Sequence, residues 1–174
     1  MEKSANIIID WIVSVHGELD QEETKCLEVG AGSGWLSKAF IEKDVNIVQI
    51  DADQECISFL ERKFNNKGIR GFIQDISREN KFDLVVSVCT VEHLLDPIFD
   101  LGKFYEILND RGGVFLSLPN LNSKLLNKNI NLHRYFAFPA HLNYFSPKAI
   151  EYALKKVGFD SVIVESLTFD WEAL

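Results

Sequence analysis

The segment KCLEVGAGSGWL, residues 25–36, carries the strongest indication of the fold of this chain. Its first half predicts a buried strand, and three glycines at every second position follow before a helix-like run begins. Glycine is needed where the backbone takes a positive φ or approaches a ligand too closely for a Cβ atom. A strand that ends in such a turn and feeds a helix forms a cradle at the carboxyl edge of an α/β sheet. The alternative interpretation is a glycine-rich connection that binds nothing.

The glycine spacing differs from the dinucleotide fingerprint G-x-G-x-x-G. The third glycine, Gly34, comes one residue early, and Trp35 stands where the fingerprint has glycine. Glu28 also lies two residues before Gly30. A carboxylate there would repel a pyrophosphate at the helix N-terminus, whereas it would attract a ligand with an ammonium and a sulfonium. The pattern therefore argues against a nicotinamide-dependent oxidoreductase, which we keep as a less favoured alternative.

The segment LEVGAGSG, residues 27–34, resembles motif I of the class I S-adenosylmethionine-dependent methyltransferases. The resemblance extends over roughly residues 26–169. It implies an α/β fold: a Rossmann-like, doubly wound, mostly parallel sheet in the order 3-2-1-4-5-6, with helices on both faces. The usual seventh strand of that family is not recognisable in this sequence. The resemblance also implies S-adenosyl-L-methionine as the cofactor.

The composition is that of one globular domain of 174 residues, with 47% hydrophobic and 25% charged residues. A net charge of −8 argues against a large nucleic-acid footprint. The three cysteines are widely spaced, without a C-x-x-C or Cys/His cluster, so we expect neither disulfides nor a metal site. This cysteine usage favours the cytoplasm. The apolar run 7–15 is too short to span a bilayer, so we expect no transmembrane segment.

Within the single domain 1–174 we expect four parts. Residues 1–24 form an N-terminal helix and loop, and residues 25–118 form the cofactor-binding core. Residues 119–146 are an irregular insertion over the substrate entrance, since long irregular insertions in compact domains are usually functional. Residues 147–174 give the last helix and strand. The expected strands are 25–29, 46–50, 69–73, 82–88, 114–118 and 161–169, with a turn over 110–113.

Acidic residues follow the expected strands at places that suit a nucleoside. Asp51 lies 21 residues after Gly30, close to the roughly 20-residue offset at which an acid holds ribose hydroxyls. On the family resemblance, the cofactor-binding residues are Glu28, Gly30, Ala31, Gly32 and Gly34 near the methionine moiety, Asp51 and Ala52 at the ribose, Asp75 and Ile76 at the adenine, and Cys89 and Thr90 at the sulfonium. The alternative for Asp51 and Asp75 is a solvated turn acid.

Two further segments resemble the small-molecule branch related to ubiquinone and menaquinone methyltransferases. They are V-E-H-L-x-D-P over residues 91–97 and H-x-x-x-F-S over residues 141–146. The chain lacks the (Asp/Asn)-Pro-Pro-aromatic motif of amino-directed methyltransferases after its fourth expected strand. The resemblance therefore implies methyl transfer to a small-molecule acceptor at a hydroxyl oxygen. The alternative from another class is a methyltransferase-like module that binds without turnover.

A hydroxyl nucleophile must lose its proton, and histidine titrates near neutrality, with an unperturbed pKa of about 6.5. His93, which follows the fourth expected strand, is the first candidate base, and His141 in the insertion is the second. The alternatives are a helix-start residue bonded to the backbone for His93 and a structural residue for His141. As partners we expect a small-molecule substrate and no nucleic acid. The unrecognised seventh strand leaves three alternatives: a truncated chain, a sheet edge completed by a partner chain, as in a homodimer, or a defective site.

Overall fold

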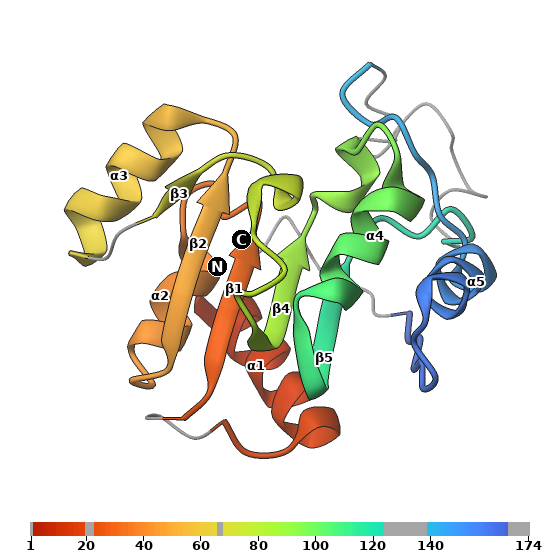
Figure 1. The fold of residues 1–174 in the computed structure, drawn as a ribbon, viewed down its shortest axis with the longest axis horizontal. Coiled ribbons are helices and arrows are strands. Elements are labelled where there is room, and N and C mark those ends of the chain that lie inside the picture. The colour runs from red at the N-terminus through yellow and green to blue at the C-terminus, as the bar shows by residue number, and fades with distance from the viewer. Residues whose placement is uncertain (1, 20–22, 66–67, 124–138, 167–174) are drawn as a thin grey trace.

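The structure is a computed structural model that describes residues 2–19, 23–65, 68–123 and 139–166. Its centre is a five-stranded sheet in the order β3-β2-β1-β4-β5, in which all neighbours run parallel (Figure 1). This confirms the predicted doubly wound order as far as the fifth strand. The strands are β1 (Lys25–Val29), β2 (Asn46–Asp51), β3 (Ile69–Arg70), β4 (Phe82–Val88) and β5 (Leu108–Ser117).

Helices cover both faces of the sheet, as expected for buried parallel strands. Helices α1 (Glu2–His16) and α2 (Trp35–Ile41) share one apolar core with inward residues of β1 and β4. Helices α4 (Pro97–Glu106) and α5 (Pro147–Val157) pack on the opposite face (Figure 1). Helix α3 (Gln54–Phe64) runs beside β2 and β3. No helix in the described ranges is both long and apolar enough to cross a bilayer.

Three helices begin at capping residues that the sequence contains in the expected places. The side chains of Asp53, Asp96 and Ser146 each accept a hydrogen bond from a backbone N–H of the first turn, at 2.8, 3.0 and 3.2 Å. Pro97 and Pro147 follow the second and third of these caps. Such caps satisfy N–H groups that have no partner within the helix, so the local sequence fixes where each helix starts.

The predictions for the third and fifth strands were wrong in their bounds. Strand β3 spans only Ile69–Arg70, and a 3-10 helix, η1 (Ile73–Asp75), replaces its predicted end. Residues 110–113 do not form a separate turn, because β5 already begins at Leu108 and bulges over this stretch. A Cβ on Gly112 would lie 3.0 Å from the Phe82 carbonyl oxygen. The glycine therefore allows the bulge to pass close to β4.

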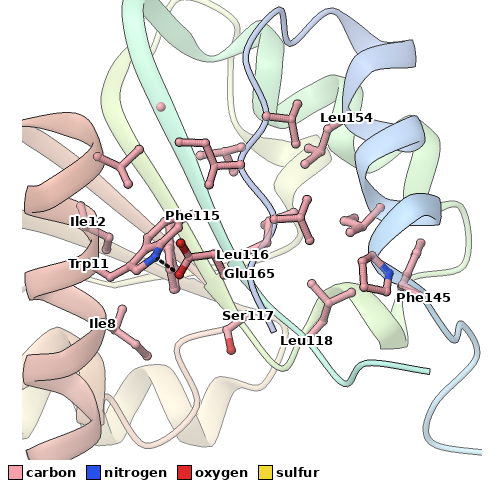
Figure 2. A pocket seen from close by; sticks show the side chains of 18 of the residues that line it. Ile8, Trp11, Ile12, Phe115, Leu116, Ser117, Leu118, Phe145, Leu154 and Glu165 are labelled. Atoms are coloured by element: carbon pink, nitrogen blue, oxygen red, sulfur yellow. Dashed lines mark hydrogen bonds between the residues drawn. The ribbon is translucent and has the colours of Figure 1, made fainter. Parts of the chain in front are cut away.

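The predicted sixth strand over 161–169 is not formed by residues 161–166, and residues 167–169 lie outside the described part. Residues 161–166 join no ladder, so among the described residues β5 pairs with β4 alone. The segment contacts α1 instead, because Trp11 Nε1 donates a hydrogen bond of 3.0 Å to Glu165 Oε2. The outer edge of β5 thus faces a space between α1 and this segment (Figure 2).

Candidate functional site

The glycine turn after β1 is fixed by its neighbours on both sides. The Gly30 N–H donates to the Ile50 carbonyl at 2.9 Å. Gly30 has a φ of 75°, and a Cβ there would overlap the side chain of Thr90. The Thr90 hydroxyl in turn lies 3.3 Å from the Val29 carbonyl oxygen, to which it can donate. Glycine at position 30 therefore lets the end of β1 close against the end of β4.

Ala31 and Gly34 attach the same turn to helix α3. Ala31 is 3% exposed and packs with Ile57 and Leu60. A Cβ on Gly34 would overlap the Leu60 side chain, so this glycine serves the close packing of two helices. Neither residue presents a side chain to solvent, and both act by shaping the turn.

Of the three glycines in this turn, Gly32 is the one that faces open space. Its φ is 50°, and a Cβ at this position would meet no atom within 4 Å. Its N–H donates to Asp51 Oδ2 at 2.9 Å. The outer side of the turn therefore has room for a ligand directly against the backbone, next to the carboxyl group that ends β2.

Asp51 connects the ends of β1 and β2. While one oxygen accepts from Gly32, its Oδ1 accepts from the Asp53 N–H at 2.9 Å. The side chain is partly exposed and the neighbouring Ala52 is exposed. Each carboxylate oxygen has two acceptor sites, so Asp51 can hold the turn and still accept bonds from two vicinal hydroxyls. The structure thus brings Gly32, Asp51 and Ala52 to one sheet edge, where the sequence places them.

Glu28 lies beneath this turn. It is 3% exposed and accepts a hydrogen bond from the Ser37 hydroxyl at the start of α2. Burial and, to a smaller extent, the nearby Asp51 raise the pKa of Glu28 to about 8, against the opposing effect of the Ser37 bonds. The carboxyl is therefore largely protonated at neutral pH and supports the turn from inside. Its predicted contact with the ammonium group of a ligand stays a prediction.

Asp75 and Ile76 lie at the end of the 3-10 helix after β3. Asp75 is exposed, and its Oδ2 accepts from the Phe72 N–H at 2.8 Å. Ile76 is 4% exposed and packs into the core on the α4 and α5 face. The Asp75 carboxylate keeps acceptor capacity toward solvent, whereas Ile76 offers little free surface. Their predicted contacts with an adenine ring stay predictions.

Cys89 and Thr90 end β4 next to the glycine turn. Cys89 takes a φ of 52°, which is uncommon outside glycine. Although the residue as a whole is exposed, burial of its thiol, followed by the charge of Glu92, raises the pKa of Cys89 to about 11. The thiol therefore stays neutral near the place predicted for the sulfonium.

The two candidate histidines lie side by side beyond β4. His93 ends the 3-10 helix η2 (Val91–His93), and its ring centroid lies 4.7 Å from that of His141. His93 Nδ1 is 2.7 Å from the Ala140 carbonyl oxygen, which can only accept, so in the neutral ring Nδ1 donates and Nε2 keeps its lone pair. The backbone contact expected in the alternative interpretation of His93 is thus present, and its role as a base stays a prediction.

Glu92 is the residue that the sequence reasoning missed. It is 1% exposed, and neither of its carboxylate oxygens has a hydrogen-bond partner in the described residues. Burial raises its pKa, while its own backbone N–H and then the charges of His93 and His141 lower it. One ligand-type atom from each of these three residues lies within 4.8 Å of the others. Glu92 and His93 belong to one sequence motif and His141 to another, and nothing in the spacing of the two motifs predicts that they meet.

A cavity of about 480 Å³ opens beside β5, between α1, α5 and residues 161–166 (Figure 2). Its volume lies in the range of small-molecule sites, about 300–1,000 Å³. The cavity reaches the carboxyl ends of β4 and β5, where Cys89 and Ser117 line it. Its wall is mostly apolar and includes Ile8, Trp11, Ile12, Leu118, Phe145 and Leu154. Of the predicted insertion 119–146, residues 124–138 lie outside the described part. The two described ends of the insertion are joined by a hydrogen bond of 2.8 Å from the Leu121 N–H to the Phe145 carbonyl.

The chain is similar to known methyltransferases in sequence and in fold. It is 28% identical over 124 residues to a ubiquinone biosynthesis O-methyltransferase of Leptothrix cholodnii, covering 67% of this chain and 52% of the relative. A SAM-dependent methyltransferase from Archaeoglobus fulgidus has a TM-score of 0.67 at 18% identity, covering 97% and 82% of the two chains. The plantazolicin methyltransferase BpumL, solved in complex with SAH, has a TM-score of 0.74 at 13% identity, covering 90% and 64%.

At these identities the two solved structures show the fold alone. The chain spans about half to two thirds of the length of the curated relatives it matches. The model of the methyltransferase-domain family matches residues 5–164, which is nearly the whole chain. This confirms the predicted resemblance to the class I enzymes that use S-adenosylmethionine, and the chain belongs to the methyltransferase-domain family.

Proposed function

We propose that this protein transfers a methyl group from S-adenosylmethionine to a hydroxyl oxygen of a small molecule. The observation that carries the proposal is the pair formed by Gly32 and Asp51. The open face of Gly32 leaves room for the donor, and the 2.9 Å bond to Asp51 sets a carboxylate beside that room. Membership in the methyltransferase-domain family supports the choice of donor.

In this proposal, the residues at the strand ends each contact a different part of the donor. Asp51 and Ala52 hold the ribose, Asp75 and Ile76 meet the adenine, and the glycine turn takes the methionine moiety. Cys89 and Thr90 line the sulfonium. When bound, the donor supplies an electrophilic methyl group, so the chain has to align the acceptor with it and exclude water. Residues 25–118 then form the donor-binding core, and residues 119–146 cover the acceptor.

The acceptor proton goes to one of the two histidines beyond β4. Their rings lie next to each other, and the lone pair on His93 Nε2 is free of the Ala140 contact. This lone pair supports His93 as the base, with His141 as its alternative.

The acceptor we propose carries an apolar ring or chain. The support is the mostly apolar wall of the cavity beside β5, which reaches Cys89 at the end of β4. The name of the Leptothrix relative, a ubiquinone biosynthesis O-methyltransferase, points to the same chemical class. The outer edge of β5, which has no partner strand among the described residues, supports a homodimer as a further part of the proposal. Three free cysteines support action in the cytoplasm.

Isothermal titration with S-adenosylhomocysteine tests donor binding. We expect micromolar affinity for the wild-type protein and a loss of at least about 10-fold in Asp51→Ala, because each charge-assisted hydrogen bond is worth roughly 1.5–3 kcal/mol. The matched control is Asp160→Ala, at an exposed position after α5. A folded wild-type protein that binds no S-adenosylhomocysteine contradicts the proposal.

Methyl transfer from labelled donor to a panel of phenols, catechols and aliphatic alcohols tests the reaction itself. Binding without transfer to any acceptor would favour a methyltransferase-like module without turnover. The observation that motivates this second candidate is the unpaired outer edge of β5 in the described residues.

A further inference from the structure

We infer that Glu92, His93 and His141 together bind one divalent transition-metal ion of the zinc class. The inference goes beyond methyl transfer, because the ion would bind whether or not a donor is present. It also departs from the expectation of no metal site, which is based on the absence of a C-x-x-C motif and of a Cys/His cluster in the sequence.

The ligand set is the first support. One carboxylate oxygen and one nitrogen from each of two imidazoles lie within 4.8 Å of one another. Catalytic zinc sites use such sets of three protein ligands and leave a fourth position open. Tetrahedral zinc with bonds of 2.0–2.1 Å needs ligand atoms roughly 3.3 Å apart, so modest side-chain rotation closes the set. Two nitrogen ligands disfavour Mg²⁺ and Ca²⁺, which prefer oxygen.

The second, independent support is the unsatisfied state of Glu92. Its side chain is 1% exposed, and among the described residues neither carboxylate oxygen has a hydrogen-bond partner. A buried carboxyl group without a hydrogen-bond partner is costly, and native proteins pair such groups or use them to bind metals. A cation between Glu92 and the two imidazoles removes that cost.

The third support is the backbone around the cluster. The Ala140 carbonyl accepts from His93 Nδ1 at 2.7 Å, which orients the ring and leaves Nε2 for a metal, as outer-shell carbonyls do in known sites. The Glu92 carbonyl accepts from the Leu142 and Asn143 N–H groups, at 2.8 and 2.9 Å. These bonds join η2 to the segment that carries His141, so the three ligands stay together without an ion.

Metal binding would change the proposed role of His93, and only this consequence rests on the proposed function. If His93 Nε2 binds a metal ion, it is not free to take the acceptor proton. The ion would then hold the acceptor hydroxyl and lower its pKa, which is the usual role of Zn²⁺ toward bound oxygen.

Zinc binding to the full chain tests the inference. After removal of metal with a chelator, we expect one equivalent of Zn²⁺ by titration calorimetry, and a visible absorption band from Co²⁺ in the same site. Glu92→Gln, His93→Gln and His141→Gln each lower the Zn²⁺ affinity by more than about 100-fold, the upper end for outer-shell changes. His16→Gln is the control, because His16 lies at the end of α1 beside the Asp83 carbonyl.

Two outcomes overturn the inference: a folded wild-type protein that binds no Zn²⁺, or binding that survives in the His93 and His141 variants. The two histidine variants decide the matter if Glu92→Gln fails to fold, because neither histidine is buried. Preference for Mg²⁺ over Zn²⁺ would contradict the metal class. S-adenosylhomocysteine titration of the same samples tests the proposed function separately, so failure of one is distinguishable from failure of the other.

Discussion

Strands β1 and β5 show how differently the two halves of one sheet are held. Strand β1 pairs with β2 on one side and β4 on the other, and four of its five residues are buried. Strand β5 pairs only with β4 in the described part, and of its ten residues Leu108 alone is buried. The first ends in the glycine turn, whereas the second borders the cavity of about 480 Å³.

The difference separates a fixed half from an adaptable half of the molecule. Around β1, hydrogen bonds and core packing on both sides leave the turn little freedom, which suits a ligand of constant shape. Around β5, an outer edge that no other described strand pairs with and half-buried side chains tolerate change, which suits acceptors that vary. Matched variants on the two sides of the sheet test this contrast.

Truncating a core phenylalanine should cost far more on the fixed side than at the cavity. Phe40 is fully buried between α2 and the sheet, so Phe40→Ala is expected to lower the free energy of unfolding by roughly 3–5 kcal/mol. Phe115 is half-buried at the cavity, where its ring lies 5.3 Å from that of Trp11. We expect Phe115→Ala to lower the free energy of unfolding by less than about 2 kcal/mol, since little new cavity forms. Urea unfolding measures the free energy of unfolding of both variants. Equal losses in Phe40→Ala and Phe115→Ala would contradict the contrast between the two sides of the sheet.

The glycines of the turn should differ in their effects on stability and on ligand binding. Alanine at Gly30 combines a positive φ with overlap of Thr90, so Gly30→Ala is expected to cost roughly 2–4 kcal/mol of unfolding free energy. Gly32→Ala meets no atom and should cost only about 1–2 kcal/mol, yet weaken S-adenosylhomocysteine binding. Gly102→Ala, at an unobstructed position inside α4, is the control and should stabilise by about 0.5–1 kcal/mol. A larger loss of unfolding free energy in Gly32→Ala than in Gly30→Ala would contradict a structural role for Gly30 and a ligand-facing role for Gly32.

The buried Glu28 should make stability depend on pH. Its pKa is about 8 in the folded protein against 4.5 for the free group. Between pH 4.5 and 8 the unfolded chain loses this proton while the folded protein keeps it, so the free energy of unfolding falls as pH rises. Glu28→Gln removes this loss and is expected to be roughly 1–3 kcal/mol more stable than wild type at pH 8, with little difference near pH 4.5.

Urea unfolding at several pH values between 4.5 and 8 measures the effect of Glu28. Glu79→Gln, at an exposed position, should keep the wild-type slope. An unchanged slope in Glu28→Gln would show that Glu28 is ionised in the folded protein.

The parts of the fold that the sequence predicted well are those that local chemistry determines. Asp53, Asp96 and Ser146 begin their helices because a capping side chain needs only the next turn. The apolar run of β4 and the glycine turn after β1 likewise carry their signals within a few residues. These local signals are sufficient to place Gly32 and Asp51 at one sheet edge.

The remaining differences arise from contacts between distant segments. The bulge in β5 depends on how close Gly112 comes to β4, which the sequence presents only as a glycine pair. Apolar residues at 161–166 read as a strand, yet strand pairing needs a neighbour at the right distance. The meeting of Glu92 with His141 requires the segment before α5 to fold back onto η2. No local pattern encodes such a return.

The contact between Trp11 and Glu165 should have the smallest effect. The 3.0 Å hydrogen bond between them is exposed and joins residues 161–166 to α1. Glu165→Ala is expected to lower the free energy of unfolding by less than about 1 kcal/mol, because solvent competes for both groups. Glu165→Gln keeps an acceptor oxygen and should change the free energy of unfolding still less. Acrylamide quenching of tryptophan fluorescence should rise in Glu165→Ala, since the segment then covers Trp11 less. A loss comparable to that of Phe40→Ala would mean that this segment belongs to the fixed half of the molecule.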